Sequence, residues 1–264
     1  MPYNRLSTGK IARIVGCHPN TVRLYEQIGF IAPVPRSAKG YRLYTEAHLD
    51  QMRLARMAMS GVYPGPSIRR SLIALIRRTA AGDYPGALSL AYQHLEIVRA
   101  ERLQADAAAD FLERWASGDP PPALDQPLLI GQAARLLNLT NDMLRNWERN
   151  GLISVPRSPR SRYRLYQAAQ IGRLRVIRLL RQAGYSPMAI LRMLILFDQG
   201  AAADLRQALD TPRPDEDVYM AADRWLSTLA DQERRARDLI ALVEDMVEKY
   251  AQTPSEPAAS SPSD

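Results

Sequence analysis

One sequence pattern occurs twice in this chain of 264 residues. Each copy has an arginine, an aromatic residue, a glutamate and a glycine, followed by the tetrapeptide Tyr-Arg-Leu-Tyr. The matched residues, all 122 positions apart, include Arg23 and Arg145, Tyr25 and Trp147, Glu26 and Glu148, Gly29 and Gly151, and Tyr44 and Tyr166. A period of this length is that of a small domain and not of a solenoid unit. The pattern therefore predicts two copies of one domain in a single chain, in agreement with the usual length per domain.

Positive charge is concentrated in the two copies. The net charge of the chain is +7, but residues 1–60 carry +6 and residues 128–183 carry +9, so the remainder carries −8. Clustered basic residues of this kind indicate nucleic-acid binding. The competing interpretation is a basic face that serves only solubility.

The composition excludes several other classes of protein. A hydrophobic fraction of 46% supports packed cores, so the chain is not a disordered protein. The single cysteine, Cys17, excludes a disulfide framework and a multi-thiolate metal site within one chain. No apolar run has the roughly 20 residues of a membrane helix, and the start of the chain lacks a secretory signal. We therefore expect a cytoplasmic protein with no cofactor.

Capping and turn signals predict a pair of short helices at the start of each copy. Ser7 or Thr8 can cap a helix that reaches Val15, and a second helix starts at Pro19 and ends near Gly29. The second copy predicts helices over 130–137 and 141–150, with Thr140 as the cap of the latter. Two short helices separated by a few residues form a helix-turn-helix.

The next segments predict a wing and then more helices. Residues 32–44 and 154–166 combine Pro, Ser and Gly with the alternating Tyr-Arg-Leu-Tyr, which is typical of a turn leading into a short strand. The copies slip by one residue here, as loops allow. Helix pairs are predicted at about 46–60 and 67–79, and at about 168–182 and 187–198. Long helices follow at about 84–115 and 215–250.

Both long helices carry apolar residues at coiled-coil spacing. The second has a regular seam, made of Ala222, Trp225, Leu229, Gln232, Ala236, Leu239, Val243, Met246 and Tyr250. The first is less regular, because Arg102 interrupts the series Leu88, Ala91, Leu95, Val98, Ala105 and Leu112.

These elements predict a mainly α fold with two winged helix-turn-helix domains, each followed by a long coiled-coil helix. The expected order is a first winged domain (1–80), a long helix (81–117), a linker (118–127), a second winged domain (128–200), a connector with the second long helix (201–250), and a disordered tail (251–264).

The order of elements resembles that of the MerR-type transcription regulators. The resemblance is specific over residues 23–31 and 36–44, and it extends over about 5–115 and 128–250. It implies a winged-helix dimer held by an antiparallel coiled coil of the long helices. It also implies a near-palindromic promoter element with an overlong spacer, which the protein bends and untwists so that RNA polymerase engages both hexamers.

Candidate DNA-binding residues lie in the second helix and the wing of each copy. Recognition-helix residues near the first turn can reach base edges, which selects Asn20, Thr21, Arg23, Asp142, Met143 and Arg145. The resemblance adds Tyr25 and Trp147 near the DNA backbone, and Arg36, Arg42, Arg157 and Arg164 on phosphates. The remaining wing candidates are Lys39, Tyr41, Arg160, Arg162 and Tyr163.

Some of these positions have a second interpretation. Glu26 and Glu148 repel phosphate, so we expect them to be internal partners of a basic residue. Tyr41 and Tyr163, together with the neighbouring leucines Leu43 and Leu165, can instead form the core of the wing.

The chain departs from the resembled family in three ways. The duplication predicts a single-chain pseudo-dimer, with pairing to a second chain as the alternative. Asp142 stands where the first copy has Asn20, which predicts two half-sites of different sequence. No cysteine lies near the long helices to sense a metal, and Cys17 is expected to be a small buried residue and not a redox sensor. A small pocket near Phe197, Trp115 or Trp225 is a further option, although such aromatics more often belong to the core.

The sequence therefore predicts a sequence-specific regulator that binds double-stranded promoter DNA, with RNA polymerase as a partner implied by the resemblance. The alternative is an architectural or nucleoid protein that bends DNA without a specific promoter. No enzyme is expected, because no nucleophile–base pair, phosphate-binding glycine loop or metal-ligand spacing is present.

Overall fold

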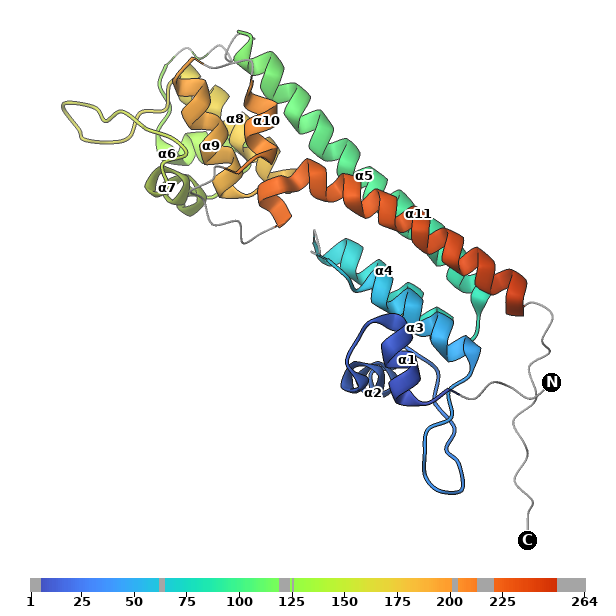
Figure 1. The fold of residues 1–264 in the computed structure, drawn as a ribbon. Helices are drawn as coiled ribbons and strands as arrows, with labels where there is room; N and C mark the ends of the chain where they lie inside the picture. The colour runs from blue at the N-terminus through green and yellow to red at the C-terminus, as the bar shows by residue number, and fades with distance from the viewer. Residues whose placement is uncertain are drawn as a thin grey trace. The chain divides into compact units, whose positions relative to one another are not determined.

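The computed structural model describes residues 6–61, 65–118, 124, 126–200, 204–212 and 221–250, which belong to two compact units. Unit 1 comprises Met1–Val98 and Gln232–Asp264, and unit 2 comprises Arg99–Asp231. The boundaries between the units fall inside both long helices, α5 (Tyr84–Ala116) and α11 (Trp225–Tyr250) (Figure 1). Each unit thus combines one helix-turn-helix with a part of each long helix.

In unit 1, the helix-turn-helix consists of α1 (Thr8–Val15) and α2 (Pro19–Gln27). It is followed by α3 (Glu46–Ala58), α4 (Pro66–Ala80) and the first half of α5. The core is formed by fully buried apolar side chains from every one of these helices, among them Ile11, Val22, Met52, Leu54, Ile68, Leu75 and Val98.

Unit 2 repeats this order with α6 (Ile130–Leu137), α7 (Asn141–Arg149), α8 (Ala168–Gln182) and α9 (Pro187–Asp198). A short helix α10 (Leu205–Asp210) and a 3₁₀ helix (Ala221–Arg224) connect it to α11. Its core has the same character, with Ala133, Leu144, Ile171, Leu174, Ile177, Ile190 and Met193 fully buried.

The predicted helices of the described residues are confirmed, most of them to within two residues. The Ser7 hydroxyl accepts a hydrogen bond from the Lys10 amide at the start of α1, and the Ser186 hydroxyl caps α9 in the same way. The prediction of a mainly α fold with two long helices is therefore correct. The second long helix starts later than predicted, at Trp225, and the positions 215–220 lie outside the described residues.

The predicted wing strands are not present in the described part of the chain. Each wing contains only isolated antiparallel bridges, Arg36 with Arg42 and Arg157 with Arg164. A second bridge anchors the base of each segment, Leu6 with Tyr44 and Leu128 with Tyr166. The alternating tetrapeptide is too short to extend the ladder, so we refer to residues 35–43 and 156–165 as hairpin segments.

The predicted coiled-coil seams are buried. Along α11, every described seam side chain from Trp225 to Met246 is at most 3% exposed, and only Tyr250 at the end is half-buried. Ala222 belongs to the positions whose side chains lie outside the described part. On α5, Ala91, Leu95, Val98, Ala105 and Leu112 are buried, whereas Leu88 is only half-buried and Arg102, which interrupts the seam, is exposed.

Within unit 1 the first half of α5 packs against the second half of α11. The Tyr92 hydroxyl donates a hydrogen bond to Glu244 Oε1 at 2.8 Å, and the rings of Tyr84 and Tyr250 stack with their centroids 5.0 Å apart. The two helices of one chain therefore contact each other, 152 residues apart in sequence at Tyr92 and Glu244.

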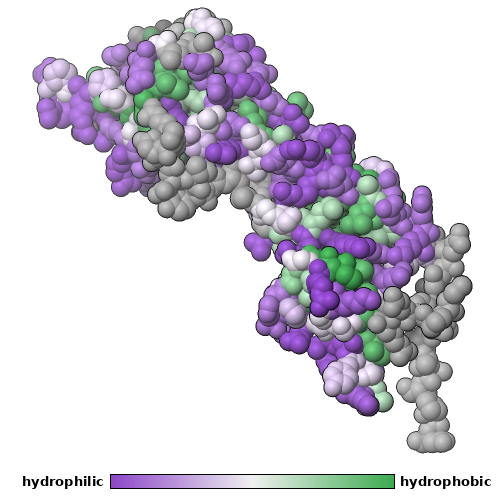
Figure 2. Space-filling model, in the orientation of Figure 1, coloured by the Kyte–Doolittle hydropathy of each residue, from purple (hydrophilic) through white to green (hydrophobic). Residues whose placement is uncertain are grey.

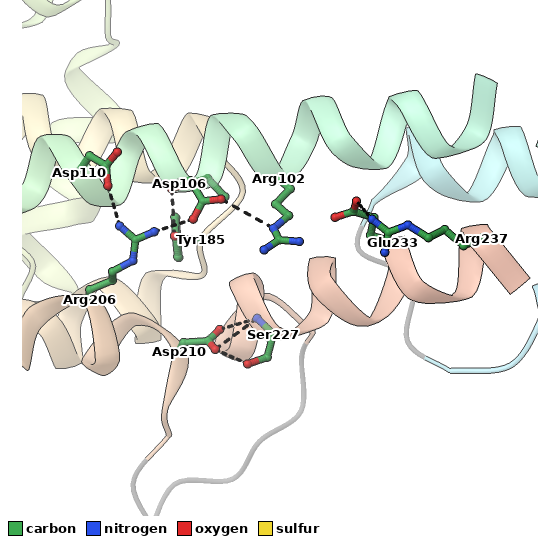
Figure 3. Close-up of polar contacts among 10 residues, drawn as sticks. Arg102, Asp106, Asp110, Tyr185, Arg206, Asp210, Ser227, Glu233 and Arg237 are labelled. Carbon is green, nitrogen blue, oxygen red and sulfur yellow. Dashed lines mark hydrogen bonds and ion pairs between the residues drawn. The ribbon is translucent and has the colours of Figure 1, made fainter. Parts of the chain in front are cut away.

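Within unit 2, polar contacts attach α10 and α9 to the second half of α5 (Figure 3). Arg206 of α10 donates to Asp106 and Asp110 of α5, each at 2.6 Å. The buried Tyr185 hydroxyl donates to the Ala105 carbonyl at 3.1 Å. Neither α10 nor these contacts were predicted, because no local spacing connects residues about 80 to 100 positions apart.

Several sequence-based predictions concern residues outside the described part: the tail at 251–264, most of the linker at 118–127, and Tyr63, the partner of Tyr185 in the repeat. No helix in the described ranges is both long enough and apolar enough to cross a membrane.

Candidate nucleic-acid interface

The turn of each helix-turn-helix is closed by contacts that leave the start of the second helix accessible. In unit 1, His18 Nδ1 accepts a hydrogen bond from the amide two residues later at 3.2 Å, and Gly16 has φ 67°. In unit 2, the Thr140 hydroxyl accepts from the Met143 amide at 3.1 Å, and Asn138 has φ 51°. Asparagine tolerates this left-handed conformation better than most side chains. The two copies thus build the same turn from different residues.

An arginine on each recognition helix is held by the residue three positions before it. Arg23 Nη1 donates to Asn20 Oδ1 at 2.9 Å, and Arg145 Nη1 donates to Asp142 Oδ1 at 2.8 Å. All four residues are exposed, and the Asp142 side chain is 90% exposed. Both guanidinium groups are thereby oriented at the surface, but only the one in unit 2 is paired with a negative charge.

The other candidates on the recognition helices differ in accessibility. Thr21 is half-buried and Met143 is 41% exposed, whereas Tyr25 and Trp147 are only 8% and 7% exposed. The Tyr25 ring packs edge-on against Phe30 with centroids 5.4 Å apart. The two aromatic rings therefore belong to the core beneath each recognition helix, with only an edge at the surface.

The hairpin segments of the two units share one hydrogen-bonding pattern and differ in length. The bridge from Arg36 to Arg42 encloses one residue fewer than the bridge from Arg157 to Arg164. This difference accounts for the one-residue slip in the repeat. In unit 2 the longer turn places Arg162 in the left-handed region, with φ 60°.

The tips of the hairpin segments are exposed and basic. Tyr41 and Tyr163 are 72% and 67% exposed, so their assignment to a wing core is wrong, whereas Leu43 and Leu165 are half-buried. The exposed cations are Arg36, Lys39, Arg157, Arg160 and Arg162. In Figure 2, the hairpin segment of unit 2, at the upper left, is covered mainly by hydrophilic residues.

An ion pair joins each hairpin segment to its recognition helix. Arg42 Nε lies 2.5 Å from Glu26 Oε2, and Arg164 Nε lies 2.5 Å from Glu148 Oε2. The prediction that both glutamates are internal partners is therefore confirmed. In each pair both side chains are 16–27% exposed, so the contacts are neither fully buried nor free in solvent. They fix the angle between wing and helix, and each arginine keeps its other nitrogens available.

A groove in unit 2 brings most of these cations together. Its volume is about 700 Å³, and it lies between the start of α6, the recognition helix and the hairpin segment. The basic residues that line it are Arg135, Arg145, Arg157, Arg162 and Arg164, beside Tyr163. Five guanidinium groups around one groove form a strong local positive potential, suited to a polyanion. No carboxylate lines the groove, although Asp142 and Glu148 each pair with one of its arginines.

Arg135 lines this groove but was not among the predicted DNA-binding residues. Arg135 repeats Arg13 at the same offset of 122, and this repetition of a basic residue was the signal that could have identified it. Residues 129–132, at the start of α6, also line the groove, but no sequence pattern pointed to them.

Cys17 lies in the turn of the first helix-turn-helix and is partly exposed. Burial raises the pKa of its thiol, an effect that the nearby Arg56 opposes. A thiol with a raised pKa is largely protonated at neutral pH and is a poor nucleophile. The poor reactivity agrees with the expectation that Cys17 is not a redox sensor, but the residue is only partly buried and not fully buried as predicted.

Two family models match this chain. The model described as "MerR HTH family regulatory protein" matches residues 128–195, and the model described as "MerR family regulatory protein" matches residues 7–44. Both matches cover a helix-turn-helix, and one falls in each unit.

Curated relatives match over shorter parts of the chain. The HTH-type transcriptional regulator CueR of Escherichia coli O6:H1 is 38% identical over 53 residues, which are 20% of this chain and 39% of the relative. HmrR of Sinorhizobium medicae, also an HTH-type transcriptional regulator, is 32% identical over 85 residues, or 32% of this chain and 58% of the relative. The match thus spans about two fifths of CueR and somewhat more than half of HmrR. No solved structure matches the chain.

The two matches coincide with the two copies that the repeat predicts. They also agree with the resemblance to MerR-type regulators that the sequence motifs indicate. The chain therefore contains two helix-turn-helix modules of the MerR type, one at residues 7–44 and another at 128–195.

Proposed function

We propose that this protein is a sequence-specific regulator of transcription that binds double-stranded promoter DNA through both helix-turn-helix modules. The arginine-lined groove beside the recognition helix of unit 2 carries the proposal, because a groove with five guanidinium groups suits a phosphate backbone. The names of the matched relatives, HTH-type transcriptional regulators, support it.

The proposed contacts fall into two groups. Side chains at the start of the recognition helices read base edges, and these are Asn20, Thr21, Arg23, Asp142, Met143 and Arg145. Hairpin residues contact phosphates and set the register, and these are Arg36, Lys39, Tyr41, Arg42, Arg157, Arg160, Arg162, Tyr163 and Arg164. Tyr25 and Trp147 support the recognition helices and offer only an edge to the backbone.

We further propose that the chain acts as a pseudo-dimer, with its two modules on the two half-sites of one promoter element. The contacts between α5 and α11 in unit 1 support this, because the two long helices of a single chain already pair there. The alternative is a homodimer in which equivalent helices of two chains pair. In either form, distortion of the promoter for RNA polymerase follows from the resemblance to the family.

The two half-sites are proposed to differ in sequence. Asn20 can both donate and accept hydrogen bonds, whereas ionised Asp142 only accepts. A carboxylate at this position favours a base that offers a donor, such as cytosine N4. The recognition helix of unit 2 should therefore prefer a different base from that of unit 1.

Selection from random double-stranded DNA with the full chain tests the proposal. We expect one enriched site with two unequal halves and a specificity ratio of about 10³ or more over random DNA at physiological salt. A ratio near unity would instead indicate an architectural DNA-bending protein. A perfect inverted repeat would reject unequal half-sites.

The mass of the complex tests the pseudo-dimer. One chain of 29.6 kDa on one full site is expected by native mass spectrometry or multi-angle light scattering. Two chains per site would support the homodimer.

A further inference from the structure

Unit 2 contains a cavity of about 560 Å³ that the proposed DNA contacts do not use. It lies between the chain that follows Gly151, the first turns of α8, the end of α9, and Trp115 near the end of α5. Sites for small molecules commonly have volumes of about 300–1,000 Å³ and are mostly apolar with a few polar groups. The cavity has both the size and the kind of lining that such a site requires.

Two aromatic side chains form one wall of this cavity. The rings of Trp115 and Phe197 lie 4.2 Å apart between centroids at an angle of 30°, and both residues are partly exposed. Core aromatics would be enclosed on all sides, whereas these two rings border open space. An exposed stacked pair of this kind presents flat π surface to a planar ring. Ile153 and Ala169 add aliphatic surface beside it.

The charged groups at the cavity neutralise each other. Arg173 Nη1 and Nη2 donate to the two carboxylate oxygens of Asp198 at 2.6 and 2.9 Å, and Arg173 Nε donates to the Leu152 carbonyl at 2.9 Å. A charged ligand would have to compete with this two-point ion pair. The hydroxyl of Ser154 and the amide of Gln170 are the uncharged polar groups in the lining. A neutral ligand that forms hydrogen bonds therefore fits better than an ion.

The corresponding place in unit 1 is occupied by the protein itself. Asp50, which is matched by Gly172 in unit 2, binds Lys249 Nζ and the Tyr250 hydroxyl at 2.8 Å each. Gln51, which is matched by Arg173, accepts from the Ala32 amide at 2.8 Å and donates to a backbone carbonyl of α4. The last residues of α11 thus cover the first turns of α3. In unit 2 the first turns of α8 have no carboxylate at the matched position, and they line the cavity.

We propose that the cavity of unit 2 binds a small, neutral, planar aromatic molecule, stacked on Trp115 and Phe197 and hydrogen-bonded to Ser154 and Gln170. The cavity adjoins Gly151 to Ser154, the segment that leads into the hairpin of unit 2. A ligand in the cavity acts on that hairpin segment and thereby changes the affinity of the protein for DNA. This consequence rests on the proposed function.

Binding is measured on the full chain without DNA, so that the result does not depend on the proposed function. The probe is naphthalene-2-carboxamide, followed by calorimetry and saturation-transfer NMR. Ala169→Phe fills the cavity from an exposed position of α8, and Ser154→Leu removes a polar group from a second exposed position. Ala47→Phe, at the matched position of unit 1, is the control. Thermal melting checks that each variant folds.

We expect one saturable site, at least tenfold weaker in Ala169→Phe and weakened in Ser154→Leu, but unchanged in Ala47→Phe. Cyclohexanecarboxamide and naphthalene-2-carboxylate should bind more weakly, because they lack the aromatic plane or carry a charge. The proposal is overturned by equal affinity in folded Ala169→Phe, by equal affinity for the carboxylate, or by no saturable binding up to about 1 mM. If the probe binds but leaves affinity for a selected DNA site unchanged, the link to the hairpin is overturned and the binding site stands.

Discussion

Asp142 pairs with Arg145 at 2.8 Å on the recognition helix of unit 2, where the matched residues of unit 1, Asn20 and Arg23, form a neutral hydrogen bond of 2.9 Å. The geometry of the two contacts is nearly the same, but their charge differs by one unit. Because both pairs are exposed, neither contributes much to the stability of the fold. We therefore expect the difference between them to affect DNA binding more than stability.

Asp142→Asn should strengthen binding to random DNA, in which no base donor is matched to the carboxylate. The substitution removes a negative charge that repels phosphates and that neutralises Arg145, although an asparagine can still accept from Arg145 as Asn20 does from Arg23. We expect a several-fold rise in affinity, and a salt dependence that is steeper by about one unit of slope if the arginine gains a phosphate contact. Fluorescence anisotropy at several salt concentrations measures both. The matched variant Asn20→Asp should lower DNA affinity. If both variants change the affinity in the same direction, the charge at this position does not control binding.

Arg164→Ala should weaken binding to all DNA sequences and flatten the salt dependence. It should also lower stability by about 1 kcal/mol, because it leaves the partly buried Glu148 without its partner. Thermal melting and salt titrations separate the two effects. The double variant Arg164→Ala with Glu148→Gln should regain stability, but the dependence of its DNA affinity on salt should stay flattened. If Arg164→Ala alone leaves this salt dependence unchanged, Arg164 does not contact phosphate.

The sequence predicted those parts of the fold that depend on neighbouring residues. Helix α6 was predicted with its observed bounds, and the Thr140 cap was recognised, because capping acts over three or four positions. The sequence also predicted that Glu26 is the internal partner of a basic residue, because a carboxylate repels phosphate, but it did not identify that residue as Arg42.

Contacts between distant segments could not be predicted in the same way. Arg206 and its partners Asp106 and Asp110 lie about 100 positions apart, so no spacing rule connects them. The exposure of Tyr41 was also missed, because strand alternation does not tell which side of a short hairpin faces the core. The cavity beside Trp115 brings together residues of α5, α8 and α9, and no local sequence pattern connects them.

Acid should destabilise unit 1 through His94. This residue of α5 is 1% exposed, and burial lowers the pKa of its imidazole to about 4. The Ser71 hydroxyl donates to the Ile68 carbonyl, so its oxygen accepts a hydrogen bond of 2.7 Å from His94 Nδ1. The folded protein thus holds a neutral imidazole, whereas the unfolded chain protonates it near pH 6.5.

The resulting stability is present in full above pH 6.5 and is lost as the pH falls toward 4, by up to about 3 kcal/mol. Urea unfolding between pH 4 and 7.5 measures this loss. His94→Leu should flatten the curve over this range. A curve of equal slope in His94→Leu would assign the acid sensitivity to other groups.

Alkaline conditions should release the end of α11 from α3. The carboxylate of Asp50, which is 6% exposed, accepts from Lys249 and Tyr250, each at 2.8 Å. The hydrogen bond to Asp50 raises the pKa of Lys249, and burial together with Asp50 raises the pKa of the Tyr250 hydroxyl. Raised pKa values mean that the folded state holds both protons more tightly than the unfolded chain.

Stability from these groups is therefore full below about pH 10 and declines as the pH rises further. Asp50→Asn should reduce this decline and lower stability at pH 7 by about 1–3 kcal/mol, because the buried acceptor of hydrogen bonds from Arg53, Lys249 and Tyr250 loses its charge. Chemical unfolding from pH 7 to 11 measures both effects. Glu248→Gln, one residue before Lys249 and exposed, is the control and should leave the pH profile unchanged. If the stability of Asp50→Asn declines with pH as steeply as that of the unmodified protein, the alkaline sensitivity arises elsewhere in the chain.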